Sequence, residues 1–125
     1  MRALTLVCVG GAVGSGTRYL VAVAAGRWIS PDFPYGTLLV NLAGAFLIGL
    51  VQQLAATSVL SEDSRLLLST GAMGGLTTYS AFSYETVRLV QLGAWRAASA
   101  NVVVTTVLCL ALCVAGMAAG RLLTR

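Results

Sequence analysis

The chain has 125 residues, of which 58% are hydrophobic and 10% are charged, and its formal net charge is +4. A soluble domain carries about a quarter charged residues, so the composition excludes that class and indicates an integral membrane protein. Histidine is absent and the arginines lie in or near the ends of apolar segments, which argues against histidine-based catalysis and against nucleic-acid binding.

Four apolar stretches predict a single all-α transmembrane domain over residues 1–125. A helix needs about 20 apolar residues to span the hydrocarbon core of a bilayer, and each stretch is long enough. We expect the helices at about residues 3–25, 35–57, 66–92 and 97–123. Pro31 and Pro34 mark the connection between the first two.

Small and polar residues mark inward-facing positions in the first two helices. Gly10 and Gly14 form a small-xxx-small pair, which lets another helix approach closely. Asn41 lies nearly two turns into the second helix, where a carboxamide in lipid would be costly. Two interpretations of Asn41 stay open: a hydrogen bond between helices, or a contact with an ion in a pore.

The third stretch has the most unusual composition, GAMGGLTTYSAFSYET at residues 71–86. Glycine weakens a helix, and Ser and Thr hydroxyls compete for backbone partners. The pattern predicts a helix broken near the membrane midplane, and interrupted helices recur at ion sites in membranes. Glu85 and Arg88 follow at a spacing of three, and we expect them to form an interfacial ion pair.

The fourth stretch has a polar stripe near its start and a small-residue pair near its end. Asn101 and Thr105 are four residues apart and share one helix face. Gly116 and Gly120 form a GxxxG pair that predicts another close helix contact.

The arginines are balanced between the two sides of the predicted four-helix arrangement. One side carries Arg2, Arg65, Arg121 and Arg125, and the other carries Arg18, Arg27, Arg88 and Arg96. Because an excess of basic residues normally sets orientation, this balance predicts a special insertion route or a chain that inserts both ways. The glycine faces then favour a dual-topology antiparallel homodimer, with the two broken helices meeting near the midplane.

The residues inside the predicted membrane segments favour ion transport over enzymatic activity. They offer Asn, Ser, Thr and Tyr donors, aromatic edges and freed backbone carbonyls, with no paired carboxylates. Neutral donors and ring edges suit a small anion, whereas exposed carbonyls suit a small hard cation. The residues alone therefore predict a small-ion pathway without choosing the ion.

Three segments resemble the Fluc/CrcB fluoride channel family, and the likeness covers essentially the whole chain. They are GGAVGSGTRY at 10–19, GTLLVNLAGAFLIG at 36–49 and GAMGGLTTYSAFSYE at 71–85. The resemblance implies an antiparallel homodimer in the plasma membrane with two pores that export fluoride passively. It also implies a structural sodium ion at the dimer interface, held by the backbone carbonyls of Gly74 and Thr77.

The resemblance further implies which side chains line the fluoride pore. By motif position they are Arg18, Asn41, Tyr79, Ser80, Phe82, Ser83, Glu85, Asn101 and Thr105. Tyr79 and Phe82 take the places of the family's paired pore phenylalanines. Tyr79 adds a hydroxyl there, and Asn101 stands where tyrosine is more usual in the family.

Two other functions are compatible with a short four-helix membrane protein. A proton-coupled exporter similar to the small multidrug transporters needs a carboxylate in its first helix, and residues 3–25 contain none. A non-transporting assembly subunit would explain the glycine pairs but not the run GGLTTYSAF.

Overall fold

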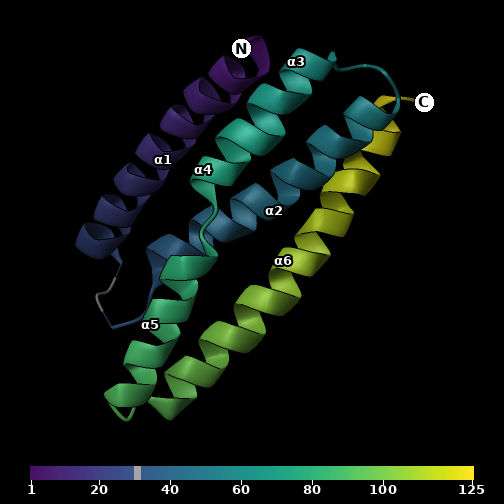
Figure 1. The fold of residues 1–125 in the computed structure, drawn as a ribbon. Coiled ribbons are helices and arrows are strands. Elements are labelled where there is room, and N and C mark those ends of the chain that lie inside the picture. The colour runs from purple at the N-terminus through teal and green to yellow at the C-terminus, as the bar shows by residue number, and fades with distance from the viewer. Residues whose placement is uncertain (30–31) are drawn as a thin grey trace.

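The computed structural model describes residues 1–29 and 32–125, and every regular element in these ranges is helical (Figure 1). Three long helices are α1 (Arg2–Trp28), α2 (Tyr35–Ala56) and α6 (Trp95–Leu123). The third predicted segment is divided among α3 (Glu62–Arg65), η1 (Leu66–Met73), α4 (Gly74–Leu76) and α5 (Tyr79–Gln91). The all-helical prediction is thereby confirmed. Ser30 and Pro31 of the predicted first connection lie outside the described residues.

The third segment begins earlier than the sequence predicted. Ser61 caps it, because its hydroxyl accepts a hydrogen bond from the Ser64 amide at 3.2 Å. Glu62 and Asp63 occupy the first turn, where acidic side chains favour the helix N-terminus. The polar residues 62–65, which lie before the predicted start of the segment, are therefore helical, and they run into the wider π-helical turns of η1.

Both termini and α3 lie at one end of the molecule, as four membrane passes require (Figure 1). The turn between α5 and α6 lies at the opposite end, where Gly93 has a φ of +73°. This left-handed backbone conformation is one that glycine adopts without steric cost. In space, α1 packs against η1 and α4, and α2 packs against α6.

Glycines bring the backbones of these packed helices into direct contact. A methyl group added at Gly10 would collide with the carbonyl oxygen of Leu67, and one at Gly14 with that of Ala72. On the other side of the molecule, a methyl group at Gly116 would collide with the carbonyl oxygen of Phe46. The predicted close-packing role of these residues is confirmed.

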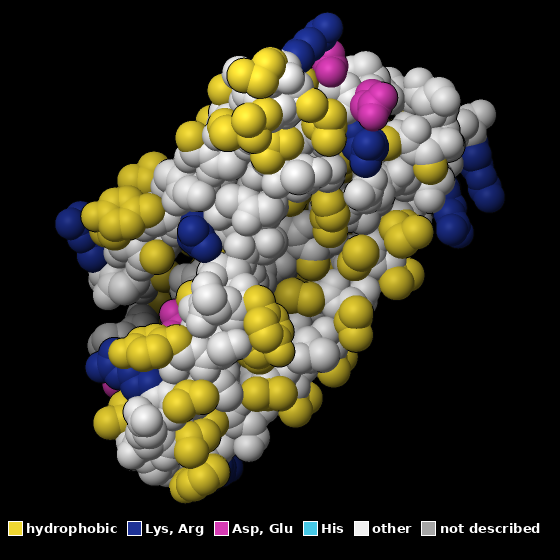
Figure 2. Space-filling view, viewed as in Figure 1, with side chains coloured by type: hydrophobic (Ala, Val, Ile, Leu, Met, Phe, Trp, Pro, Cys, Tyr) yellow, Lys and Arg dark blue, Asp and Glu magenta, His cyan; other side chains and the backbone are white. Residues whose placement is uncertain are grey.

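The outer surface of α6 is apolar between its two ends. Figure 2 shows α6 as a band of hydrophobic and uncharged side chains with basic side chains at either end. Exposed residues along α6 include Val103, Val107, Leu110 and Val114. In the described part of the chain, α1, α2 and α6 are each long and apolar enough to cross a membrane. The chain is thus a multi-pass membrane protein.

Candidate functional site

The break in the third segment lies at two threonines. α4 ends at Leu76, and both Thr77 (φ −80°, ψ 152°) and Thr78 (φ −150°, ψ 112°) have extended backbone before α5 begins at Tyr79. The structure therefore narrows the predicted break from residues 71–86 to this pair. Gly74 and Gly75 stay helical.

Asn41 of α2 bonds both main-chain groups of the residue at the break. Its Nδ2 donates to the carbonyl oxygen of Thr78 at 3.2 Å, and its Oδ1 accepts from the Thr78 amide at 2.8 Å. A broken helix inside a membrane needs such substitute partners because lipid provides none. Of the two open interpretations of Asn41, the hydrogen bond between helices is therefore present.

The four backbone carbonyls of residues 74–77 lose their usual helical donors at the break, and those of Gly74 and Thr77 are among them. In an unbroken helix the Thr78 amide would bond the Gly74 carbonyl, and the Ala81 amide would bond the Thr77 carbonyl. Instead the Thr78 amide bonds Asn41, and the Ala81 amide bonds the Thr78 hydroxyl at 3.2 Å. Gly74 and Thr77 are the two residues whose carbonyls, by the family resemblance, are expected to hold a sodium ion. Such unwound carbonyls are the oxygen donors that suit a small hard cation.

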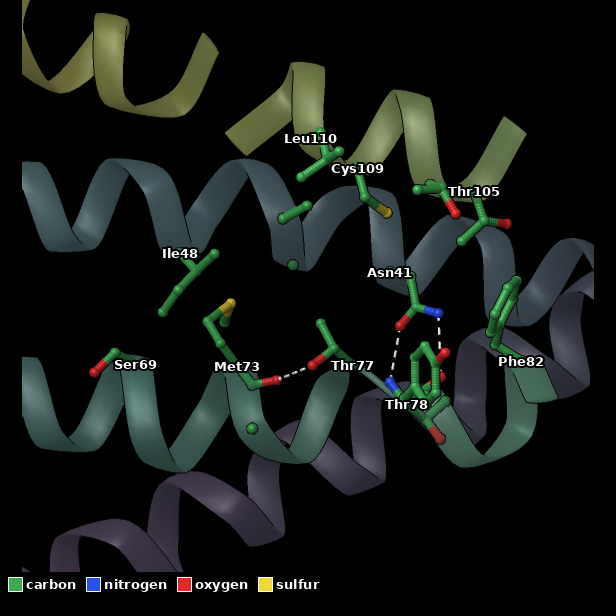
Figure 3. A pocket seen from close by; sticks show the side chains of 15 residues that line it. Asn41, Ile48, Ser69, Met73, Thr77, Thr78, Phe82, Thr105, Cys109 and Leu110 are labelled. Carbon is green, nitrogen blue, oxygen red and sulfur yellow. Dashed lines mark hydrogen bonds between the residues drawn. The ribbon is translucent and has the colours of Figure 1, made fainter. Parts of the chain in front are cut away.

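A groove of about 550 Å³ opens beside the break, between the third segment on one side and α2 with α6 on the other (Figure 3). Polar and aromatic side chains gather toward one end of it, among them Asn41, Thr77, Thr78, Phe82 and Thr105. Apolar side chains lie toward the other end, among them Ile48, Met73 and Leu110. The polar end of the groove is thus the part where the helix is broken.

Tyr79 and Phe82 form an aromatic pair on the wall of this groove. Their ring centroids are 5.4 Å apart and their planes are tilted by 44°. Phe82 is half-buried, whereas 80% of Tyr79 is exposed. The first turn of α5 therefore presents a largely uncovered aromatic residue at the level of the break.

Glu85 lies at a second, smaller hollow of about 170 Å³. Its Oε1 accepts a hydrogen bond from the Thr37 hydroxyl of α2 at 2.7 Å, and its Oε2 is buried without a hydrogen-bond partner in the described chain. The predicted ion pair with Arg88 is wrong, because the carboxylate turns toward α2 instead. Sequence reasoning missed Thr37. It lies four residues before Asn41, and this shared helix face was the available signal.

Asn101 and Thr105 connect α6 to α5. Asn101 is only 2% exposed; its Nδ2 donates to the Thr86 hydroxyl at 2.9 Å, and its Oδ1 accepts from the Thr105 hydroxyl at 3.3 Å. Thr105 lines the groove, but Asn101 lies behind the groove wall. Thr86 is a second residue that sequence reasoning missed, although it is four residues after Phe82 on the same helix face.

The remaining predicted pore residues lie outside the groove lining. Ser80 has its hydroxyl oxygen 3.1 Å from that of Thr78, and the Ser83 hydroxyl donates to the Tyr79 carbonyl at 2.8 Å. Arg18 is half-buried on α1 and lines neither hollow. One chain alone therefore brings Asn41, Tyr79, Phe82 and Thr105 together, but not Arg18.

Known proteins resemble this chain over most of its length. The family described as "CrcB-like protein, Camphor Resistance (CrcB)" matches residues 5–117. The chain is 50% identical to a fluoride-specific ion channel FluC of Anaeromyxobacter sp. (strain K) over 111 residues, 88% of each chain. It is 47% identical to the FluC protein of Sorangium cellulosum over 90% of each chain. The FluC protein of Agrobacterium fabrum is 45% identical over 94% of this chain and 95% of its own.

Proposed function

The chain belongs to the CrcB-like family, and we propose that it is a fluoride-selective channel that exports fluoride passively from the cytoplasm and so lowers its toxicity. The observation that carries this proposal is identity of 45% to 50%, across most of the chain, to relatives named fluoride-specific ion channels. The protein is a multi-pass protein of the plasma membrane and a transport protein rather than an enzyme. The proton-coupled exporter is disfavoured further because α1 carries no acid.

The polar end of the groove supplies the proposed fluoride path. The edges of the Tyr79 and Phe82 rings are electropositive, and hydroxyls such as that of Thr105 can replace water around an anion. Neutral donors bind an anion weakly enough to release it, which conduction requires. Glu85 follows Phe82 by three residues on the same helix face, so the path continues toward the second hollow.

The other predicted residues take supporting places in this proposal. The Asn41 carboxamide keeps the break open and forms part of the wall. Ser80 and Ser83 border the path, Asn101 supports its wall from behind, and Arg18 attracts the anion at its approach. A carboxylate repels fluoride, so the hydrogen bond from Thr37 to Glu85 matters because it fixes where that charge lies.

The uncovered groove supports an antiparallel homodimer. A break with extended backbone cannot face lipid, and the exposed Gly74 and Tyr79 lie beside it. A second copy placed over the groove would cover these groups and give two pores. The balanced arginines support an antiparallel arrangement, because neither orientation is favoured over the other.

A structural sodium ion at the dimer interface completes the proposal. The carbonyls of Gly74 and Thr77 are deprived of their helical donors and lie at the groove. Two carbonyls are too few oxygen ligands to hold a hard cation, and a second copy that adds its own two would bring the number to four. Sodium would supply positive charge that holds the two breaks together.

Efflux from liposomes tests the transport function. Purified protein is reconstituted with internal fluoride, and in parallel with internal chloride. We expect fast electrogenic fluoride efflux that is driven by the membrane potential and is indifferent to a pH gradient, together with little chloride efflux. Well-folded protein that releases neither ion, or that releases both equally, would contradict a fluoride-selective channel.

Thiol labelling tests the dual topology. Cys8, Cys109 and Cys113 are replaced by alanine, and one cysteine is added after Arg125. A membrane-impermeant thiol reagent should label about half of the protein in sealed vesicles from cells that express it. Complete labelling, or none until the vesicles are lysed, would mean a single orientation.

A further inference from the structure

A chain of hydrogen bonds leads from Asn101 of α6 to Phe82 of α5, which lines the groove. The Asn101 Nδ2 donates to the Thr86 hydroxyl at 2.9 Å, and that hydroxyl donates to the carbonyl oxygen of Phe82 at 2.7 Å. On the other side, the Thr105 hydroxyl donates to Asn101 Oδ1 at 3.3 Å. Each hydroxyl and amide group uses a different donor or acceptor site, so the whole chain can form at once.

Besides this chain, the polar contacts that hold α5 are those of Thr37 with Glu85 and of Asn41 with Thr78 at its N-terminus. The break at residues 77–78 removes the backbone hydrogen bonds that would continue α4 into α5, and Leu89 is the only buried residue within α5. Whereas α5 has little buried surface, Asn101 of α6 is the most completely buried large side chain of the described chain. Because a buried carboxamide must keep its partners, Asn101 fixes the turn of α5 that carries Thr86.

We propose that Asn101 is a positioning residue that places the Phe82 ring in the fluoride path by holding Thr86. This inference rests on the proposed channel function. Asn101 does not line the groove, so fluoride need not touch it. Its effect on fluoride passes through Thr86 to the turn of α5 that begins at Phe82.

Single-channel recording in planar bilayers tests this role. The current through one open channel reports how well each assembled pore conducts, whereas a residue that merely stabilises the fold changes how many channels appear. The variants are Asn101→Leu, which removes the amide at similar volume, Thr86→Val, which removes the hydroxyl at the same shape, and the double variant. Thr17→Val is the matched control, since the Thr17 hydroxyl bonds only the Val13 carbonyl of its own helix at 2.9 Å.

We expect each single variant to lower the unit fluoride current about threefold to tenfold, the range that corresponds to one hydrogen bond between membrane helices. The double variant should fall no further than the lower single variant, because both break the same link. Thr17→Val should keep the wild-type current. If Asn101→Leu does not fold, the isosteric Thr86→Val variant still carries the test.

Any of four results would overturn the proposal. A wild-type unit current in Thr86→Val would show that Thr86 does not carry the effect. A unit current in the double variant that is reduced by the product of the two single reductions would show the same, because the two residues would then act independently. A wild-type protein without fluoride current would overturn the proposed function, and the positioning role with it. A conducting wild type with unaltered variants would overturn the positioning role alone.

Discussion

The helices of this molecule are held together in two different ways. α1 meets η1 and α4, and α2 meets α6, through glycines that leave no room for a methyl group. By contrast, α5 is held largely by side-chain hydrogen bonds to its neighbours, from Asn41 to Thr78, from Thr37 to Glu85 and from Asn101 to Thr86. The first kind of contact depends on shape and the second on polar groups.

This difference separates the scaffold from the part that carries the chemistry. Backbone-to-backbone packing through glycine depends on close van der Waals contact and places no polar side chain in lipid. The polar contacts of α5 leave donors, carbonyls and aromatic edges around an open groove, which an ion path requires. We therefore expect scaffold substitutions to abolish folding, and substitutions at α5 contacts to change conduction in folded protein.

The largest effect should come from a collision in the scaffold. Gly14→Val adds an isopropyl group whose Cβ would collide with the Ala72 carbonyl, and overpacking of this kind costs about 2 kcal/mol or more. We expect little monodisperse protein after detergent extraction, as measured by size-exclusion chromatography. Gly16→Val is the matched control, because nothing lies within 4 Å of a methyl group added at Gly16. Equal yields of the two variants would refute the close contact.

A charge at the break should abolish conduction while the fold survives. Asn41→Asp keeps an oxygen that can accept from the Thr78 amide, but it places a negative charge on the wall of an anion path. We expect fluoride efflux from liposomes to fall at least about 100-fold. Gln52→Glu makes the same chemical change at an exposed position of the same helix and should leave efflux unchanged. Undiminished efflux in Asn41→Asp would remove Asn41 from the path.

The smallest effect should come from the contact at the second hollow. Thr37→Val removes the hydrogen bond to Glu85 and frees the carboxylate to move. We expect fluoride efflux to change about threefold, with thermal stability close to that of the wild type. Thr57→Val, at the exposed residue that follows α2, removes a hydroxyl that bonds only carbonyls of the last turn of α2, and it serves as the control. Identical efflux in the two variants would show that Thr37 does not act on the path.

The sequence predicted the scaffold better than it predicted the site. Four apolar stretches and the glycine pairs predict helices and close contacts directly, because both depend on local spacing. The position of the break did not follow from glycine, since Gly74 and Gly75 remain helical while Thr77 and Thr78 are extended. The hydrogen bond between Asn41 and Thr78 joins residues that are 37 apart in the chain, and a local sequence pattern carries no information about such a contact.

Two further contacts of the site were equally hidden. Glu85 was expected to pair with Arg88 on its own helix, but its partner is Thr37, 48 residues away. Asn101 was expected among the pore residues, yet it lies behind the groove wall and bonds Thr86. In both cases the tertiary fold supplied a polar partner that a single helix face could not reveal.

Phe82→Ile tests whether fluoride passes beside the first turn of α5. Isoleucine keeps an apolar side chain at the half-buried position but removes the electropositive ring edge. The measurement is fluoride efflux from liposomes, with thermal unfolding of the same preparation to show that it is folded. We expect efflux close to that of protein-free liposomes from a variant that unfolds near the wild-type temperature. Wild-type efflux from the folded variant would contradict a fluoride path along this aromatic pair.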